Sequence, residues 1–277
     1  MTMLFALFIS SALAATGSAQ QFTQKAPTPA DWTALAKLPD FTGVWERVGV
    51  GAGGNPVFGT PPAAGNRGAA PQRGAAPAAR GAATAPLFTP QYEAMRAAAA
   101  REPQPEDNST ANCLPPGMPG IMGQPYPMEF LLTPGKVTVI IEAYTQVRHI
   151  YTDGRTLPQD PDPKFFGTSI GHWEGDTLVA ETVGFSDHVQ LARGVPHGDK
   201  MKIVERFRLT DPDTMTIETT ITDPVVLAKP YTTVNTLRRH RNWTISEYIC
   251  EENNRNYVDQ SGKAGINLTV PGTQKKD

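Results

Sequence analysis

The second half of the chain is a series of short, evenly spaced strand-like segments, with turn signals between them and no helix-forming stretch. The segments are rich in β-branched and aromatic residues, and the turns include Asp153-Gly154, Glu174-Gly175-Asp176 and Asp223-Pro224. Short strands without intervening helices favour antiparallel sheets. The sequence therefore predicts an all-β fold, an antiparallel lipocalin-like β-barrel or closed sandwich, with strands over residues 129–134, 136–144, 146–152, 168–173, 176–185, 201–210, 214–222, 232–240 and 242–252.

The first third of the chain has a different composition. Residues 38–48 form one short strand candidate, and residues 89–102 predict one short helix, with Pro103 as a stop signal. Between them lies a Gly/Ala/Pro-rich stretch with too few large apolar side chains to offset the entropy of ordering. We expect a signal peptide at 1–19, an N-terminal segment with the first strand at 20–48, a disordered linker at 49–86, the barrel domain at 87–258 and a C-terminal tail at 259–277.

The N-terminal apolar stretch has the pattern of a secretory signal. Residues 3–13 are too few to span a bilayer as a helix, which takes about 20 residues. Small residues then offer cleavage after Ala14 or Ala19, the alternative being a buried N-terminal helix. No later apolar run is long enough to span a membrane. We expect a periplasmic or secreted protein, in which Cys113 and Cys250 form a disulfide rather than remain two free thiols.

Charge and motifs exclude several classes of function. The formal net charge is −2, and aromatic residues do not alternate with basic ones as in a nucleic-acid platform, so we expect no nucleic-acid partner. The chain contains no GxSxG nucleophile motif, and neither GxGxxG nor a P-loop follows a predicted strand. These absences leave a small molecule as the expected partner, while the oligomeric state cannot be read from the sequence.

Several charged residues interrupt apolar rows of the predicted strands. Side chains alternate between the two faces of a strand, so Glu205 shares a face with Ile203 and Phe207, and Glu181 shares one with Val179. A buried carboxylate must be paired, protonated or hydrated, and polar groups that converge in an apolar cavity are typical of small-molecule sites. The same pattern recurs at Glu142, His149 and Glu247.

Two structural alternatives account for the same pattern. The alternation can slip at a bulge, or the charged face can lie at an exposed strand end. Buried Glu–Arg pairs can also serve only the fold, with three arginines as available partners: Arg148, Arg206 and Arg238.

The histidines suggest a proton-transfer role more readily than a metal site. Asp187, His188 and His197 lie in one long loop, and His172 lies on the preceding hairpin. Their spacing matches no known zinc pattern, so a metal ion is a minor alternative and we expect no cofactor. Histidine as a general acid or base needs only proximity to its partner, and neutral structural histidines at loop ends are the equal alternative. The loop at 151–163 lacks the spacing of a calcium site and is predicted to lie at the barrel mouth, where Arg155 can hold an anionic group.

Four motifs occur in a distinctive order. "IYTDGR", "SIGHWEGDTLVAETVGF", "PHGDKMKIVERF" and "CEENN" resemble a family of secreted bacterial hypothetical proteins of the Acidobacteria and Proteobacteria, over residues 113–254. The resemblance implies no settled activity, and the family's histidine before the proline of "RTLP" is Leu157 here. In addition, "FTGVW" resembles the first strand of lipocalin-like barrels, where a Gly-x-Trp closes one end.

Two functional hypotheses follow. The first is a cofactor-independent acid/base enzyme, of lyase, isomerase or hydrolase type, that acts on a small organic or carbohydrate-derived substrate in the barrel cavity. The second is a non-catalytic periplasmic carrier that uses the same cavity. The predicted catalytic residues are Glu181, Glu205, His172 and His149, and the predicted substrate-binding residues are Arg155, Tyr151, Trp173, Glu247, Arg206, His188 and His197.

Overall fold

The structure is a computed structural model, and it describes residues 26–48, 85–101, 112–192, 194–250, 256–258, 260 and 264–266. The predicted signal peptide and all but the last two residues of the predicted linker lie outside these ranges. In the part of the chain that is described, no helix is long and apolar enough to cross a membrane.

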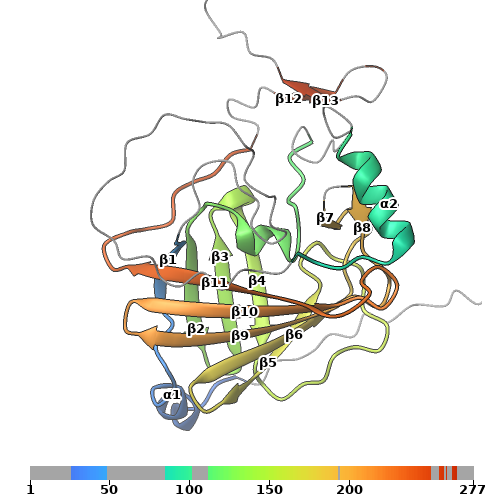
Figure 1. The fold of residues 1–277 in the computed structure, drawn as a ribbon. Coiled ribbons are helices and arrows are strands. Elements are labelled where there is room, and N and C mark those ends of the chain that lie inside the picture. Colours follow the sequence, from blue (N-terminus) through green and yellow to red (C-terminus); the bar gives the residue numbers. More distant parts are fainter. Residues whose placement is uncertain are drawn as a thin grey trace, which may run out of the picture.

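The main body is a closed barrel of β1–β6 and β9–β11, which confirms the predicted all-β fold. Neighbours follow the order β1-β11-β10-β9-β6-β5-β4-β3-β2, and Figure 1 shows β9, β10 and β11 crossing β2, β3 and β4 at a steep angle. The strands are β1 (Gly43–Arg47), β2 (Met128–Thr133), β3 (Lys136–Ile141), β4 (Gln146–Tyr151), β5 (Thr168–Glu174), β6 (Thr177–Val183), β9 (Lys202–Asp211), β10 (Thr214–Thr222) and β11 (Tyr231–His240).

One pair of strands departs from the antiparallel prediction. β4 and β5 are parallel, with Ile150 opposite Ser169, whereas every other neighbouring pair in the barrel is antiparallel. Parallel neighbours need a connection that returns the chain to its starting end. The segment 152–167, which contains most of the loop predicted at 151–163, makes this return.

The two ends of the barrel are covered differently, as Figure 1 shows. The α1 end carries α1 (Pro29–Leu35), and its first turn is closed by a capping box between Thr28 and Asp31. The α2 end carries α2 (Pro90–Ala99), which confirms the helix predicted at 89–102. Also at the α2 end are the 3-10 helix η1 (Gly120–Gly123) and the short ladder of β7 (Gln190–Ala192) and β8 (Val195–Pro196). A second small ladder joins β12 (Asn256–Val258) and β13 (Ala264–Ile266).

The core fills the barrel and continues into the α2 end. Its interior residues come from alternate positions of the strands, and the cover at the α2 end contributes Ile121 and Met122 of η1 together with Val189 and Leu191. The predicted inward face of β9 is confirmed, since Ile203, Glu205 and Phe207 are all fully buried.

The predicted inward face of β6 is wrong. Leu178, Ala180 and Thr182 are fully buried, whereas Glu181 lies between them on the outer face. The strand carries apolar residues on both faces, because Val179 is buried as well. Its alternation is therefore ambiguous, and the register with β9, which sets Ala180 opposite Glu205, decides which face points inward.

The strand predicted at 242–252 is also wrong for the residues that are described. Residues 243–249 form no strand, because β1 occupies the free edge of β11 and so closes the barrel. The segment instead lies along the outside, where Thr145 Oγ1 donates to the carbonyl of Tyr248 at 2.8 Å and the backbone N–H of Ser246 donates to Glu142 at 3.0 Å. The predicted disulfide is confirmed: Cys113 and Cys250 are joined, with their Cα atoms 5.6 Å apart.

Candidate functional site

A closed ion-pair network lies in the middle of the barrel. Glu205 of β9 and Arg148 of β4 have side chains that are 0% and 1% exposed, and Arg148 Nη1 donates to Glu205 Oε1 at 3.1 Å while Nη2 pairs with Oε2. Arg148 Nη2 also donates to Thr182 Oγ1 at 3.1 Å, and Ser169 Oγ lies 2.8 Å from Thr182 Oγ1. Each carboxylate oxygen therefore has a partner within the protein, as expected for a buried charge that serves the fold.

The other three residues that were predicted to be catalytic lie on the outer face. Glu181 forms an ion pair with Lys202 of β9. His172 Nε2 is 3.1 Å from Glu174, whose other oxygen is 2.6 Å from Arg206. The four predicted catalytic residues therefore do not meet, since the barrel wall separates Glu205 from the rest.

His149 also lies on the outside of the barrel, on β4. Its Nδ1 is 3.3 Å from Thr138 Oγ1 of β3, and its ring centroid is 6.1 Å from that of Tyr151. Partial burial, and then the nearby ammonium of Lys136, lower the pKa of His149.

The predicted substrate-binding residues are dispersed. Arg155 lies 3.8 Å above the ring of Tyr151 and binds Asp153, with Nε to Oδ1 at 2.8 Å. Trp173 packs against Phe41 at 5.2 Å. Glu247 is exposed in the segment that follows the barrel.

The residues of the predicted metal alternative do not form a ligand set. Asp187 is exposed, His188 Nδ1 is 3.2 Å from Ser186 Oγ, and His197 is held by the backbone carbonyls of Ser186 and Gly198 at 2.9 and 3.0 Å. Among the described residues, no group of three or more His, Cys, Asp or Glu is placed to bind a metal ion.

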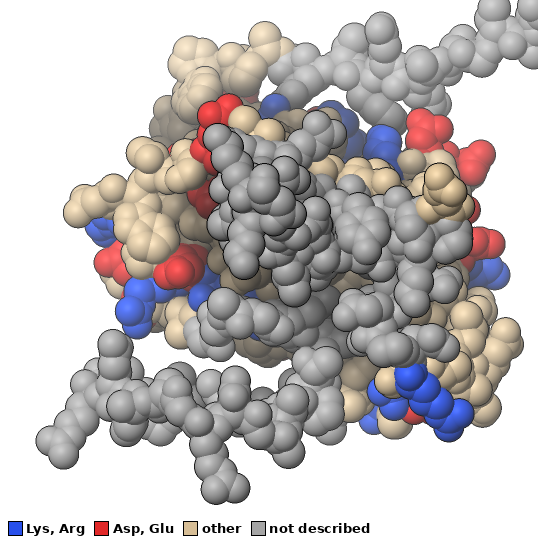
Figure 2. All heavy atoms as spheres, turned by 90° about the horizontal axis from the view of Figure 1, so that it is seen from above, with Lys and Arg blue, Asp and Glu red and all other residues tan. Residues whose placement is uncertain are grey.

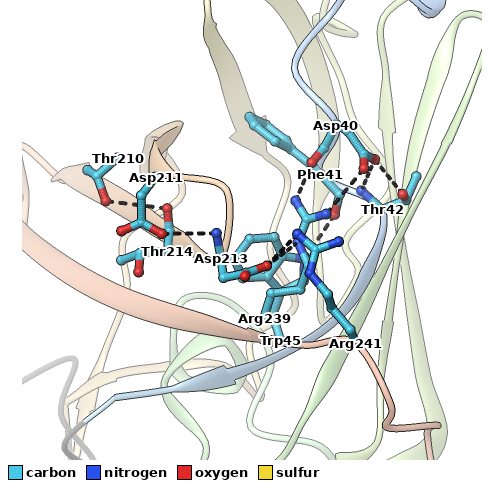
Figure 3. Close-up of polar contacts among 10 residues, drawn as sticks. All are labelled: Asp40, Phe41, Thr42, Trp45, Thr210, Asp211, Asp213, Thr214, Arg239 and Arg241. Carbon is cyan, nitrogen blue, oxygen red and sulfur yellow. Dashed lines mark hydrogen bonds and ion pairs between the residues drawn. The ribbon is translucent and has the colours of Figure 1, made fainter.

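The α1 end of the barrel is closed by an arginine stacked on a tryptophan. Figure 3 shows Arg239 of β11 over Trp45 of β1, with its Cζ 4.6 Å from the ring centroid and Nη1 3.2 Å from Asp40. Trp45 Nε1 donates to the carbonyl of Phe41 at 2.9 Å. Burial would raise the pKa of Asp40, but hydrogen bonds from Thr42 and the charge of Arg239 outweigh it and hold the pKa below its usual value.

A cleft of about 640 Å³ lies beside this closed end, between α1 and the turn that joins β2 to β3. Its walls include Leu35, Val137 and Trp173, and its two carboxylates are Asp31 and Asp153. Both are engaged within the protein, Asp31 in the capping box of α1 and Asp153 with Arg155. The cleft thus presents no charged group that needs an external partner.

The opposite end contains a row of buried or half-buried polar residues, which we call the inner polar wall: Arg47, Thr219, Thr233 and Asn235. Arg47 follows Trp45 by two residues and therefore points into the barrel, with Leu237 opposite it on β11. Thr219 and Thr233 are opposite each other on β10 and β11, and Asn235 is the next inward residue. The polar side chains thus follow one another from the end of β1 towards Glu205, which is opposite Thr219.

Hydrogen bonding on the inner polar wall is incomplete. Arg47 Nη1 donates to the carbonyl of Gly123 in η1 at 2.9 Å, but the buried Arg47 Nε and Thr233 Oγ1 have no hydrogen-bond partner in the part of the chain that the structure describes. Burial lowers the pKa of Arg47 to about 10. Thr233 and Asn235 keep 5% and 7% of their surface exposed, while the neighbouring Leu237 has none.

Sequence reasoning did not identify this wall. On β11, one face carries Thr233, Asn235 and Leu237, and the other carries Thr232, Val234 and Thr236. Both faces combine polar and apolar residues, so the pattern does not indicate which of them is buried. The only available signal was the cationic Arg47 two residues after the tryptophan that starts the barrel. No protein family, curated protein or solved structure matches this chain.

Proposed function

We propose that the protein binds a small molecule non-catalytically, at the α2 end of the barrel and against the inner polar wall. The observation that supports this is that Arg47 Nε and Thr233 Oγ1 are buried without a hydrogen-bond partner among the described residues. Two further such atoms, Asp213 Oδ1 and Arg239 Nε, lie at the α1 end, but these two are within 4.0 Å of each other. A buried polar group left without a hydrogen bond destabilises a fold by about 1–3 kcal/mol. A ligand or ordered water that accepts these bonds removes the penalty.

The surroundings are also those of a small-molecule site. A barrel of about eight strands is either filled by side chains or holds one small ligand, and ligand sites combine apolar walls with a few polar groups that fix the orientation. Here Leu237, Ile121 and Met122 supply apolar surface, and Arg47 and Asn235 supply polar groups. The stacked Arg239 and Trp45 close the α1 end. We therefore propose entry from the α2 end, where Ile121 and Met122 of η1 have to move aside.

The acid/base hypothesis remains a prediction with less geometric support. Its proposed pair, Glu205 and Glu181, lies on opposite faces of the barrel wall, and Glu205 is saturated by Arg148. We therefore favour the carrier hypothesis. An export signal at residues 1–19 and the disulfide between Cys113 and Cys250 support a periplasmic or secreted location for it.

The test is an NMR screen of small polar compounds against the ¹⁵N-labelled protein with its disulfide intact. Arg47 Nε–H and the side-chain amide of Asn235 both give resolvable signals, so binding is located directly. We expect hits that move both signals while leaving the outer-face His172 region unchanged. A broad library that moves neither signal in the folded protein refutes the proposed function.

A matched pair of variants separates the wall from the rest of the barrel. Thr233→Val removes the unpartnered inner hydroxyl, and Thr236→Val makes the same change on the outer face of the same strand. We expect Thr233→Val to stay folded and to weaken the hits severalfold, with Thr236→Val binding as the wild type does. Equal binding by both variants means that the ligand does not contact this wall.

A further inference from the structure

We propose that the ligand is an organic carboxylate whose carboxyl group pairs with the guanidinium of Arg47. This inference rests on the proposed function and names the chemical class that the same site selects. It depends on the charge and geometry of one side chain, rather than on the presence of polar atoms in general.

Among the described residues, three arginines point into the barrel, and they differ in their counter-charges. Arg148 is paired with Glu205, and Arg239 is paired with Asp40. Arg47 forms no ion pair with any carboxylate in the described parts of the chain, and its hydrogen-bond partner there is the neutral carbonyl of Gly123. A half-buried guanidinium without a counter-charge is unfavourable, so an external anion is the complement that this site lacks.

The free edge of the guanidinium suits a carboxylate. Nη1 is directed to Gly123, whereas the buried Nε has no hydrogen-bond partner among the described residues. A two-oxygen acceptor that reaches this edge of the planar group would satisfy it. Asn235 is the diagonal neighbour of Arg47 across the β1–β11 pair, within reach of a long side chain, and adds a neutral donor.

The apolar residues around Arg47 favour an organic ligand over an inorganic anion. Leu237 lies opposite it, and Gly123 directly follows the buried Ile121 and Met122. A bare oxyanion would lie against these side chains and lose its own hydration. Figure 2 looks onto the α2 end, and basic and acidic residues both occur around its rim. Among the described residues, the preference of the site for an anionic ligand therefore depends on Arg47.

The test compares three probes that share one ring: benzoate, benzamide and benzylammonium. Each is titrated into the full, disulfide-intact protein while the Arg47 Nε–H signal is followed. A charge-assisted bidentate pair predicts that benzoate binds about tenfold more tightly than benzamide, with benzylammonium weakest. Arg47→Gln should abolish the preference for benzoate, and Arg208→Gln, at an exposed position on β9, should preserve it.

Each other outcome points to a different error. If benzamide binds as well as benzoate and both move the signals of Arg47 and Asn235, the site binds a neutral ligand. The carboxylate inference is then wrong, while the proposed small-molecule binding is supported. If sodium sulfate displaces benzoate at lower concentration, the ligand is an inorganic oxyanion. If none of the three probes moves the wall signals, the carboxylate inference falls, and the library screen alone decides the proposed function.

Discussion

Glu205 should be among the residues on which the stability of the barrel depends most. In Glu205→Gln the negative charge is lost, and the guanidinium of Arg148 keeps a neutral amide oxygen and the hydroxyl groups of Ser169 and Thr182 as partners. Both members of the pair are at most 1% exposed, so water cannot replace the lost charge. Removing one member of a buried pair destabilises a protein by about 3–5 kcal/mol, a large part of the 5–15 kcal/mol that is typical of a domain.

The control is the same change at a neighbouring glutamate. Glu181 is one residue away from the wall position that faces Glu205, but its side chain is 30% exposed and its partner Lys202 is 42% exposed. Such pairs contribute less than about 1 kcal/mol. Urea denaturation, followed by tryptophan fluorescence, should therefore give a large shift in midpoint for Glu205→Gln and almost none for Glu181→Gln.

A double variant tests the reasoning itself. Replacing the pair together, as Arg148→Met with Glu205→Leu, removes both charges and should recover most of the stability that either single change loses. Similar midpoints for Glu205→Gln and Glu181→Gln would show that the interior pair is hydrated and the argument is wrong. A double variant as unstable as the single one would assign the loss to the hydroxyl network instead.

Two further predictions concern the disulfide and the surface histidine. Replacing Cys113 and Cys250 together by Ser opens a loop of 137 residues and should lower the free energy of unfolding by about 2–5 kcal/mol. The loss should appear as a lower urea midpoint. An unchanged midpoint would mean that the disulfide hardly restricts the unfolded chain. His149 has a pKa below its ordinary 6.5, so the folded state disfavours its protonation, and its contribution to stability is present above that pH and declines as the pH falls through the lowered pKa. Lys136→Met should move the pKa of His149 upward in an NMR titration, because a like charge is removed while burial remains; a pKa that stays or falls contradicts this.

The fold class was readable from the sequence because strand spacing and turn residues are local properties. β9 illustrates the favourable case: its inner face is apolar except for Glu205, and its outer face carries Lys202, Arg206 and Arg208, so one register alone is consistent with burial. β6 illustrates the opposite case, with buried residues on both faces. There the face was decided by pairing with β9, which is a non-local contact that no local pattern contains.

For a related reason, the sequence does not predict which strand pair closes the barrel. The segment 242–252 has the composition of a strand, yet the edge of β11 is taken by β1, about 190 residues earlier in the chain. Strand propensity describes how well a segment fits a half-buried sheet surface. It does not determine which of two such segments pairs with the edge of β11. The same choice brings Trp45 beside Arg239 and places Arg47 beside Leu237, so the candidate site emerges only once the barrel closes.

The separation of the two ends has a functional consequence. Arg239 stacks on Trp45 and binds Asp40, so its charge is used to close the α1 end and contributes to the fold. Arg47 lies two residues along β1 from Trp45, yet among the described residues its guanidinium is bound by a single carbonyl group, that of Gly123. Natural folds seldom keep a buried charge unpaired unless something outside the chain complements it. The contrast between these two arginines, rather than either alone, is the reason to look for a ligand at the α2 end.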